Sequence, residues 1–244
     1  VERLTEFKAL KPEVRNEAGL EVESHPIQLT FDDVTFSYNG DDAVLTRLSF
    51  DLQPGSVLGL LGRTGSGKTT IGRLIFRLYD VNTGSIKING TDIRELQLDS
   101  LRRDIAIVTQ DVQLFKASVR ENLTFFDRTI SDEKIVGTLE ELELGDWYRA
   151  LPKGLDSELE TGSRSLSAGE AQLLAFTRVF LKNPGLVILD EASSRLDPAT
   201  EVKLEHAIDK LLKNRTAIII AHRLDTIQRA DDILILERGN ALEY

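Results

Sequence analysis

The part of this chain that most constrains its fold is residues 62–69, which read Gly-Arg-Thr-Gly-Ser-Gly-Lys-Thr. This run fits the pattern G-x-x-x-x-G-K-[ST], in which glycines allow backbone N–H groups to turn inward around phosphate oxygens. The short apolar run 57–61 precedes it, and apolar side chains recur at helical spacing through residues 69–78 after it. A buried strand, a glycine-rich turn and a helix N-terminus in this order predict a binding site for the phosphates of a nucleotide.

Two side chains at the end of this run suit the same ligand. The ammonium of Lys68 is predicted to reach the β- and γ-phosphates, and the hydroxyl of Thr69 is predicted to bind Mg²⁺. The alternative is a glycine-rich turn that binds nothing. The strand before it and the helix after it favour the phosphate site.

A second chemical signal is a pair of carboxylates, Asp190 and Glu191, which follows the apolar run 186–189. In a parallel sheet, ligands bind at the carboxyl ends of the strands. Asp190 is therefore predicted to hold Mg²⁺ directly or through water, and Glu191 is predicted to take a proton from an attacking water molecule. The alternative is a solvated strand end without a chemical role.

The pattern of apolar residues predicts strands that alternate with helices. Such alternation implies an α/β fold with a mainly parallel sheet and helices on both faces. Residues from about 115 to 183 read mostly as helix and resemble an inserted subdomain. The remaining expected elements are strands at 28–36, 48–52, 57–61, 85–88, 105–108, 186–189, 217–221 and 232–236, and helices at 69–78 and 200–212.

Composition narrows the classes of function. The 244 residues include no cysteine, which excludes disulfides and thiolate metal sites. The net charge of −10 argues against a surface for nucleic acid, and the longest apolar runs are far shorter than the roughly 20 residues of a membrane span. The chain opens with Val1 and contains no methionine, so we expect a fragment or a processed chain. Residues 1–26 read as a linker or arm.

Residues 166–170, Leu-Ser-Ala-Gly-Glu, lie upstream of the acidic pair and resemble the signature of the ATP-binding-cassette (ABC) family, which is usually Leu-Ser-Gly-Gly-Gln. A P-loop kinase would lack this signature. The resemblance runs from about residue 27 to residue 244 and is closest to nucleotide-binding domains of exporter-type ABC transporters, notably at 102–115 and 118–123. It implies a P-loop NTPase core with a mainly parallel sheet, an antiparallel β subdomain and an inserted helical subdomain at about 115–183.

The resemblance implies roles for individual residues. Glu191 corresponds to the catalytic base, His222 to the histidine at the γ-phosphate, and Gln110 to the glutamine that meets Mg²⁺ and senses the membrane domain. The metal-binding set is therefore Thr69, Gln110 and Asp190. The residues implied in nucleotide binding are Tyr38, Gly62, Arg63, Thr64, Gly65, Ser66, Gly67, Lys68, Thr69, Thr70, Ser167, Gly169 and Asp197.

Four of these residues also have simpler interpretations. Tyr38 is implied to stack on adenine but could be a strand-edge aromatic, Gln110 could be a loop residue, and His222 could cap a strand end. Asp197 is implied to cross to a partner subunit, and it also precedes Pro198 as a helix N-cap would.

Two positions depart from the family pattern. Ala168 and Glu170 stand where the signature usually has Gly and Gln, but Ser167 and Glu170 form a capping-box pattern, so we expect the helix to begin there. Glu170 also adds a negative charge near the nucleotide. Thr161 takes the acidic position of a coupling segment at 159–163.

The resemblance also implies cofactors and partners. ATP and Mg²⁺ would bind between the phosphate loop of one domain and the signature of a second nucleotide-binding domain, identical or different, and a transmembrane domain would place both at the cytoplasmic face of a cell membrane. No nucleic acid is expected.

The alternatives are ABC ATPases of DNA repair or chromosome structure, whose halves are split by a long coiled coil, and translation-associated proteins with two cassettes. Only about 120 residues separate Lys68 from Asp190, without sustained heptads.

Overall fold

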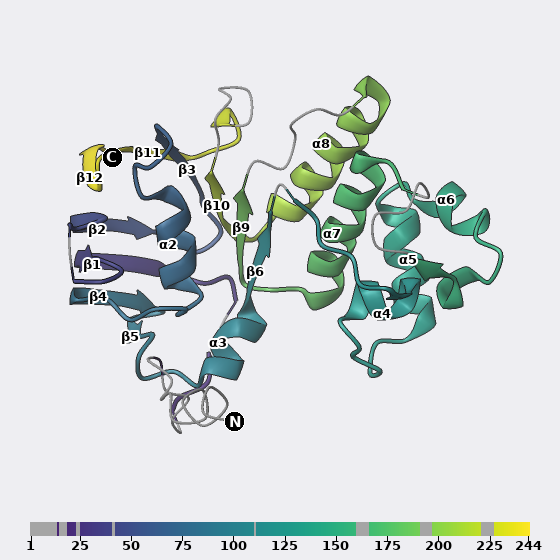
Figure 1. Cartoon of the computed structure of the whole chain (residues 1–244), viewed down its shortest axis with the longest axis horizontal. Coiled ribbons are helices and arrows are strands. Elements are labelled where there is room, and N and C mark those ends of the chain that lie inside the picture. Colours follow the sequence, from purple (N-terminus) through teal and green to yellow (C-terminus); the bar gives the residue numbers. More distant parts are fainter. Residues whose placement is uncertain are drawn as a thin grey trace, which may run out of the picture.

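The computed structural model describes residues 14, 19–22, 25–40, 42–109, 111–159, 166–190, 197–220 and 227–244. Its centre is a sheet in the order β12-β11-β3-β10-β9-β6, in which only β12 runs antiparallel to its neighbour (Figure 1). The strands of this sheet are β3 (Val57–Gly62), β6 (Ile105–Val108), β9 (Leu186–Asp190), β10 (Thr216–Ile220), β11 (Asp232–Glu237) and β12 (Asn240–Glu243).

The central parallel strands β3, β9 and β10 are buried on both faces, as their apolar runs predict. In β9, Leu186 and Ile188 join one hydrophobic cluster, whereas Val187 and Leu189 join the other. The sheet therefore separates two cores, and the carboxyl ends of its central strands form one edge.

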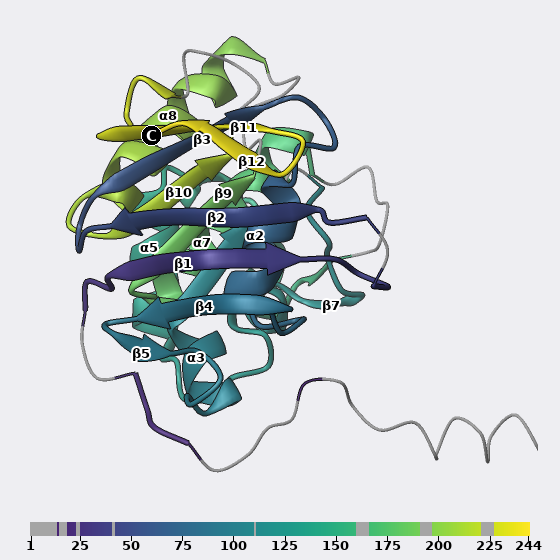
Figure 2. The ribbon, with the colours of Figure 1, turned by 90° about the vertical axis from the view of Figure 1, so that its left-hand side faces the viewer.

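A four-stranded antiparallel sheet in the order β2-β1-β4-β5 covers one side (Figure 2). Phe31 and Phe50 stack across two of its strands with their ring centres 4.5 Å apart. Helix α2 (Lys68–Ile75) lies between this sheet and the parallel sheet in Figure 1 and shares their core. The strands are β1 (Leu29–Phe36), β2 (Leu45–Leu52), β4 (Thr83–Ile88) and β5 (Thr91–Asp92).

The other core lies between the parallel sheet and a helical region (Figure 1). Helices α7 (Ala168–Lys182) and α8 (Pro198–Leu212) pack beside the sheet, and shorter helices lie beyond them. The shorter elements are α4 (Val119–Thr124), α5 (Asp132–Glu141), α6 (Gly145–Arg149), η1 (Gly154–Asp156), and a two-stranded antiparallel sheet of β7 (Ala117–Ser118) and β8 (Glu158–Leu159).

The expected strands and the two long expected helices are present, with ends that differ by a few residues. The apolar pattern extends the first helix to Leu78, but α2 ends at Ile75 because Arg77 takes a left-handed backbone with φ of 48°. Leu78 is 49% exposed and so does not extend the apolar face. The helix α3 (Leu98–Asp104) and the two-stranded sheet β7–β8 were not predicted, because they are short and lack clear periodicity.

Part of the expected N-terminal arm packs along the domain. Leu20 forms a parallel bridge with Leu96, and the backbone N–H of Val22 donates to Ser100 Oγ at 3.1 Å. Within the described ranges, none of the helices has the length and apolar character that a membrane crossing demands.

Candidate nucleotide-binding site

The predicted phosphate loop connects the end of β3 to the start of α2. Only glycine fits at position 62, because a Cβ on Gly62 would lie 2.4 Å from the Leu236 carbonyl oxygen on β11. Gly67, at the N-cap of α2, has φ of 106°, a conformation that other residues rarely adopt. The neighbouring strand and the helix N-terminus thus require glycine at two positions of the motif.

Lys68 turns back beneath the loop that precedes it. Its Nζ donates to the carbonyl oxygen of Gly62 at 2.5 Å and to that of Arg63 at 3.2 Å, and the residue is 5% exposed. Burial lowers the pKa of the Lys68 ammonium from its ordinary value, and the nearby Asp190 carboxylate opposes that shift. A partly desolvated cation bonded to neutral carbonyls would gain from an anionic ligand.

A hollow of about 190 Å³ brings together several predicted residues from separate parts of the chain. Thr69 and Asp190 both line it, although they are 121 positions apart in the sequence (190 − 69). Hydroxyl and carboxylate oxygens are ligands suited to Mg²⁺. The lining residues are Val44, Thr64, Gly65, Gly67, Lys68, Thr69, Thr70, Asp190 and Ile220.

The loop is also supported from behind, which the sequence did not indicate. The N–H of Gly239 donates to the Ser66 carbonyl oxygen at 3.1 Å, and the Gly239 carbonyl oxygen accepts from the N–H of Thr46 at 2.9 Å. Gly239 passes so close to Val44 that a Cβ would lie 2.3 Å from the Val44 carbonyl oxygen. Among the described residues, Ser66 Oγ is a buried side-chain oxygen without a hydrogen-bond partner.

Tyr38 lies against the first turns of α2. Its hydroxyl is 3.0 Å from Thr70 Oγ1 and accepts from Arg73 Nη1 at 3.1 Å. Its ring meets those of Phe36 and Tyr79 edge-on, with centres 4.9 and 5.1 Å away. Tyr38 is therefore held beside the phosphate loop, and its stacking on adenine stays a prediction.

The capping box predicted at the signature is confirmed. Ser167 is the N-cap of α7, the N–H of Glu170 donates to Ser167 Oγ at 3.1 Å, and the Ser167 N–H donates to Glu170 Oε2 at 2.7 Å. A Cβ at Gly169 would lie 2.0 Å from Thr200 Cγ2, so this glycine allows α7 to approach α8 closely. Ser167 lines a second hollow, shared with Thr200 and Lys203, which has no lining residue in common with the phosphate-loop hollow.

The N-cap interpretation of Asp197 is also confirmed. Its carboxylate accepts from the N–H of Thr200 at 3.0 Å, and Pro198 occupies the first position of α8. Hydrogen bonds from the side chain and then from the backbone of Thr200 lower the pKa of Asp197.

Three predicted residues, Gln110, Glu191 and His222, lie outside the described residues, as does the coupling segment from residue 160 to 163. The strands before these three residues are neighbours. Ile220 of β10 pairs with Asp190 of β9, and Leu189 of β9 pairs with Val108 of β6. The three strands that precede Gln110, Glu191 and His222 in the sequence therefore end at the same edge of the sheet.

A model of the ABC transporter family matches residues 45–194, more than half of the chain. The chain belongs to the ABC transporter family. This ABC domain is 41% identical over 243 residues to the uncharacterized ABC transporter ATP-binding protein YknV of Bacillus subtilis (strain 168). The match covers 99% of the domain and 40% of that protein. It is 41% identical over 217 residues to the ATP-dependent lipid A-core flippase of Idiomarina loihiensis. This match covers 88% of the domain and 37% of the flippase.

Among solved structures, the ABC domain resembles a bacterial Atm1-family ABC exporter with ATP bound, with a TM-score of 0.86 and 36% identity, over 99% of the domain and 42% of the exporter chain. The domain therefore spans about two fifths of the length of the relatives it matches. These likenesses confirm the expected fold class and the expectation of an ATP-binding ATPase domain of the ABC transporter family, similar to the corresponding part of an exporter.

Proposed function

We propose that this domain binds and hydrolyses ATP at the hollow beside Lys68 and uses the reaction to drive an exporter. The observation that carries the proposal is the convergence of the phosphate loop, the buried Lys68 ammonium and the Asp190 carboxylate in that hollow. A cradle of backbone amides, a helix N-terminus and one cation is complementary to a triphosphate.

Each part of the hollow has a chemical role in this proposal. The amides of Arg63, Thr64, Gly65 and Ser66 and the N-terminus of α2 would bind the phosphates, while Lys68 would bond to the β- and γ-phosphates. The side chains of Thr69, Thr70, Asp190 and Gln110 would complete the oxygen-rich environment, with Thr69, Asp190 and Gln110 holding Mg²⁺. A bound Mg²⁺ ion would neutralise charge between the phosphates.

Hydrolysis would require a base and a positioned water molecule. Glu191 would accept a proton from the water, whose oxygen attacks the γ-phosphorus while the bond to the β–γ bridging oxygen breaks. His222 would position the water and the γ-phosphate. The shared strand edge that precedes Glu191 and His222 supports placing both near the hollow.

A second nucleotide-binding domain, identical or different, would complete the site. The Ser167–Gly169 amides at the start of α7 would face the γ-phosphate held by the partner, and Asp197 would lie where the two domains cross. The separate hollow at Ser167 supports this arrangement, because one chain does not bring the signature to its own phosphate loop. Tyr38 would stack on the adenine.

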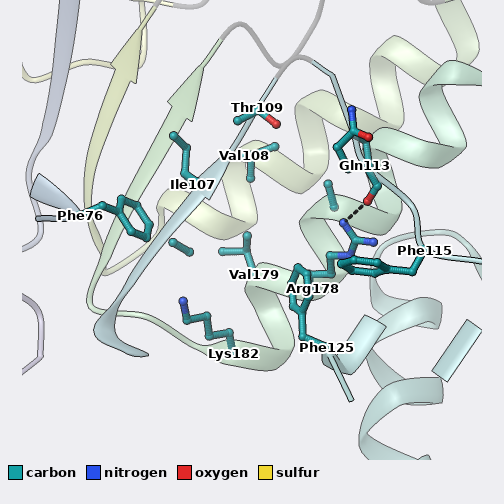
Figure 3. Close-up of a pocket in the computed structure, with 13 residues that line it drawn as sticks. Phe76, Ile107, Val108, Thr109, Gln113, Phe115, Phe125, Arg178, Val179 and Lys182 are labelled. Carbon is teal, nitrogen blue, oxygen red and sulfur yellow. Dashed lines mark hydrogen bonds between the residues drawn. The ribbon is translucent and has the colours of Figure 1, made fainter. Parts of the chain in front are cut away.

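An apolar groove supports a membrane domain as the other partner. It has a volume of about 280 Å³ and lies along the edge strand β6, with residues of α7 on one side and Phe76 on the other (Figure 3). Phe115 and Phe125 are 43% and 57% exposed there, and Ile107 is 40% exposed. We assign this groove to a cytoplasmic segment of the membrane domain, which would place the ABC domain at the cytoplasmic face of the cell membrane.

Glu191→Gln tests the proposed reaction. The variant removes the base without changing the shape of the side chain, so we expect ATP binding to persist, turnover to fall by about 100-fold or more, and ATP to trap a dimer. Steady-state phosphate release and sedimentation with ATP measure these outcomes. Glu205→Gln, on the exposed side of α8, is the matched control and should retain wild-type turnover. Undiminished turnover in Glu191→Gln would remove Glu191 from the base role, and stimulation of the ATPase by DNA or ribosomes would favour a non-transport ATPase.

A further inference from the structure

Helix α7 holds the wall of the apolar groove at two points. Arg178 Nη1 donates to the Gln113 carbonyl oxygen at 2.9 Å, a bond drawn in Figure 3. Six residues earlier on the same helix, Gln172 Nε2 donates to the Thr109 carbonyl oxygen at 3.4 Å. The segment that follows β6 is therefore hydrogen-bonded to α7 on both sides of position 110.

The Arg178 guanidinium also joins this wall to α4. Its Nε donates to the Asn122 carbonyl oxygen at 2.7 Å, and its Nη2 donates to Asn122 Oδ1 at 3.3 Å. Asn122 is fully buried, and its amide closes the network by accepting from the Phe115 N–H at 2.8 Å and donating to the Phe115 carbonyl oxygen at 2.9 Å. A buried network with its bonds satisfied is rigid and has few alternative geometries.

The same guanidinium contacts the groove itself. Its Cζ lies 4.8 Å from the centre of the Phe125 ring, and Figure 3 shows Arg178 beside Phe115 and Phe125 at one end of the groove. Burial lowers the pKa of Arg178 from its ordinary value. The planar Arg178 guanidinium thus contacts both the Phe125 ring, where a partner would bind, and the backbone carbonyl oxygens of the groove wall.

We propose that Arg178, together with Asn122, is a positioning residue that transmits occupancy of the groove to the signature at the N-terminus of α7. Arg178 and Ser167 lie about 16 Å apart along one helix, so a shift of the wall at residues 111–115 moves the helix start as a rigid unit. The inference rests on the proposed function, because the groove must receive a partner and Ser167 must face a nucleotide. It names the residue that would regulate that site.

Arg215 provides a matched control beside the C-terminal end of α7. Its Nη1 donates to the Leu211 carbonyl oxygen at 3.3 Å, its Nη2 donates to Asn183 Oδ1 at 2.6 Å, and its Cζ lies 5.4 Å from the Phe180 ring centre. The chemistry therefore matches that of Arg178, including a pKa lowered by burial. Arg215 joins the ends of α7 and α8 and does not line the groove.

The test is amide hydrogen exchange on the full-length protein in lipid nanodiscs, with and without Mg²⁺ and ATP, for peptides at 62–70 and 111–118. In the wild type, ATP should slow exchange in both peptides. In Arg178→Lys, which keeps the charge but cannot form the fork, protection at 62–70 should remain while the effect at 111–118 falls about tenfold. The kcat for ATP should fall with KM unchanged within about twofold, and Arg215→Lys should resemble the wild type.

Gln172→Ala cuts the tether at Thr109 and gives a result that does not depend on the folding of Arg178→Lys. It should weaken the response at 111–118 about two- to threefold. The inference is overturned if ATP protects 111–118 equally in the wild type and both tether variants, or if Arg215→Lys loses the response as Arg178→Lys does. Absence of protection at 62–70 in the wild type would instead contradict the proposed function.

Discussion

Glu170 and Glu121 occupy the same position in two capping boxes, and only one of them belongs to the signature. Glu121 Oε2 accepts from the Ser118 N–H at 2.9 Å in α4, as Glu170 does from Ser167 in α7. Each carboxylate stabilises the positive end of its helix. Glu170 differs because the proposed γ-phosphate of the partner would face the same helix end, where a second negative charge is unfavourable.

Glu170→Gln is therefore expected to have opposite effects on folding and on assembly. The amide oxygen can still accept from Ser167, but the helix loses a favourable charge, so the melting temperature should fall by about 1 to 3 °C. The ATP-trapped dimer formed in the Glu191→Gln background should tighten about threefold. Thermal unfolding and sedimentation measure the two effects.

Glu121→Gln is the control for this pair of measurements. It should lower the melting temperature similarly and leave dimer affinity unchanged. If Glu170→Gln weakens the dimer, or if Glu121→Gln tightens it equally, the charge at the signature does not act on the nucleotide.

At the scale of elements, two helical glycines should respond to alanine in opposite directions. Gly137 lies on the exposed side of α5, where an added Cβ would meet no atom within 4 Å. Gly137→Ala should raise the free energy of unfolding by about 0.5–1 kcal/mol, because alanine loses less conformational entropy in a helix. Gly169→Ala should lower it by about 1 kcal/mol or more, since its Cβ would overlap Thr200 on α8.

Urea unfolding without nucleotide measures both glycine variants. A stable Gly169→Ala domain would mean that α7 and α8 separate at little cost, and the close approach would then not explain this glycine. A loss of stability in Gly137→Ala would contradict the open surface of α5 at that position.

At the scale of the whole molecule, the sequence predicted the parallel core well because its strands have local signals. The runs at 57–61 and 186–189 are apolar throughout. The first is followed by the glycine-rich phosphate loop and the second by the acidic pair, so the position of each strand and the edge of the sheet at which it ends could be inferred. The capping patterns at Ser167 and Asp197 were equally local and were confirmed.

Contacts between distant segments could not be predicted in this way. The support of the phosphate loop by Gly239 and the tether from Arg178 to Gln113 each join residues more than 60 positions apart, and neither leaves a periodic pattern. The two-stranded sheet β7–β8 also pairs distant segments, which is why the region at 115–183 read as helix. Such contacts depend on how the two cores pack around the sheet.

The central claim is that the loop at 62–69, with Lys68, binds the triphosphate of ATP, and titration calorimetry with Mg²⁺ and ATP tests it most directly. The folded domain should bind one ATP with a dissociation constant of about 1 μM to 1 mM. Lys68→Ala should lose the heat of binding, while Gly137→Ala, a variant far from the loop, should bind as the wild type does. A folded wild-type domain that releases no heat, or a Lys68→Ala domain that binds ATP with unchanged affinity, would contradict the claim.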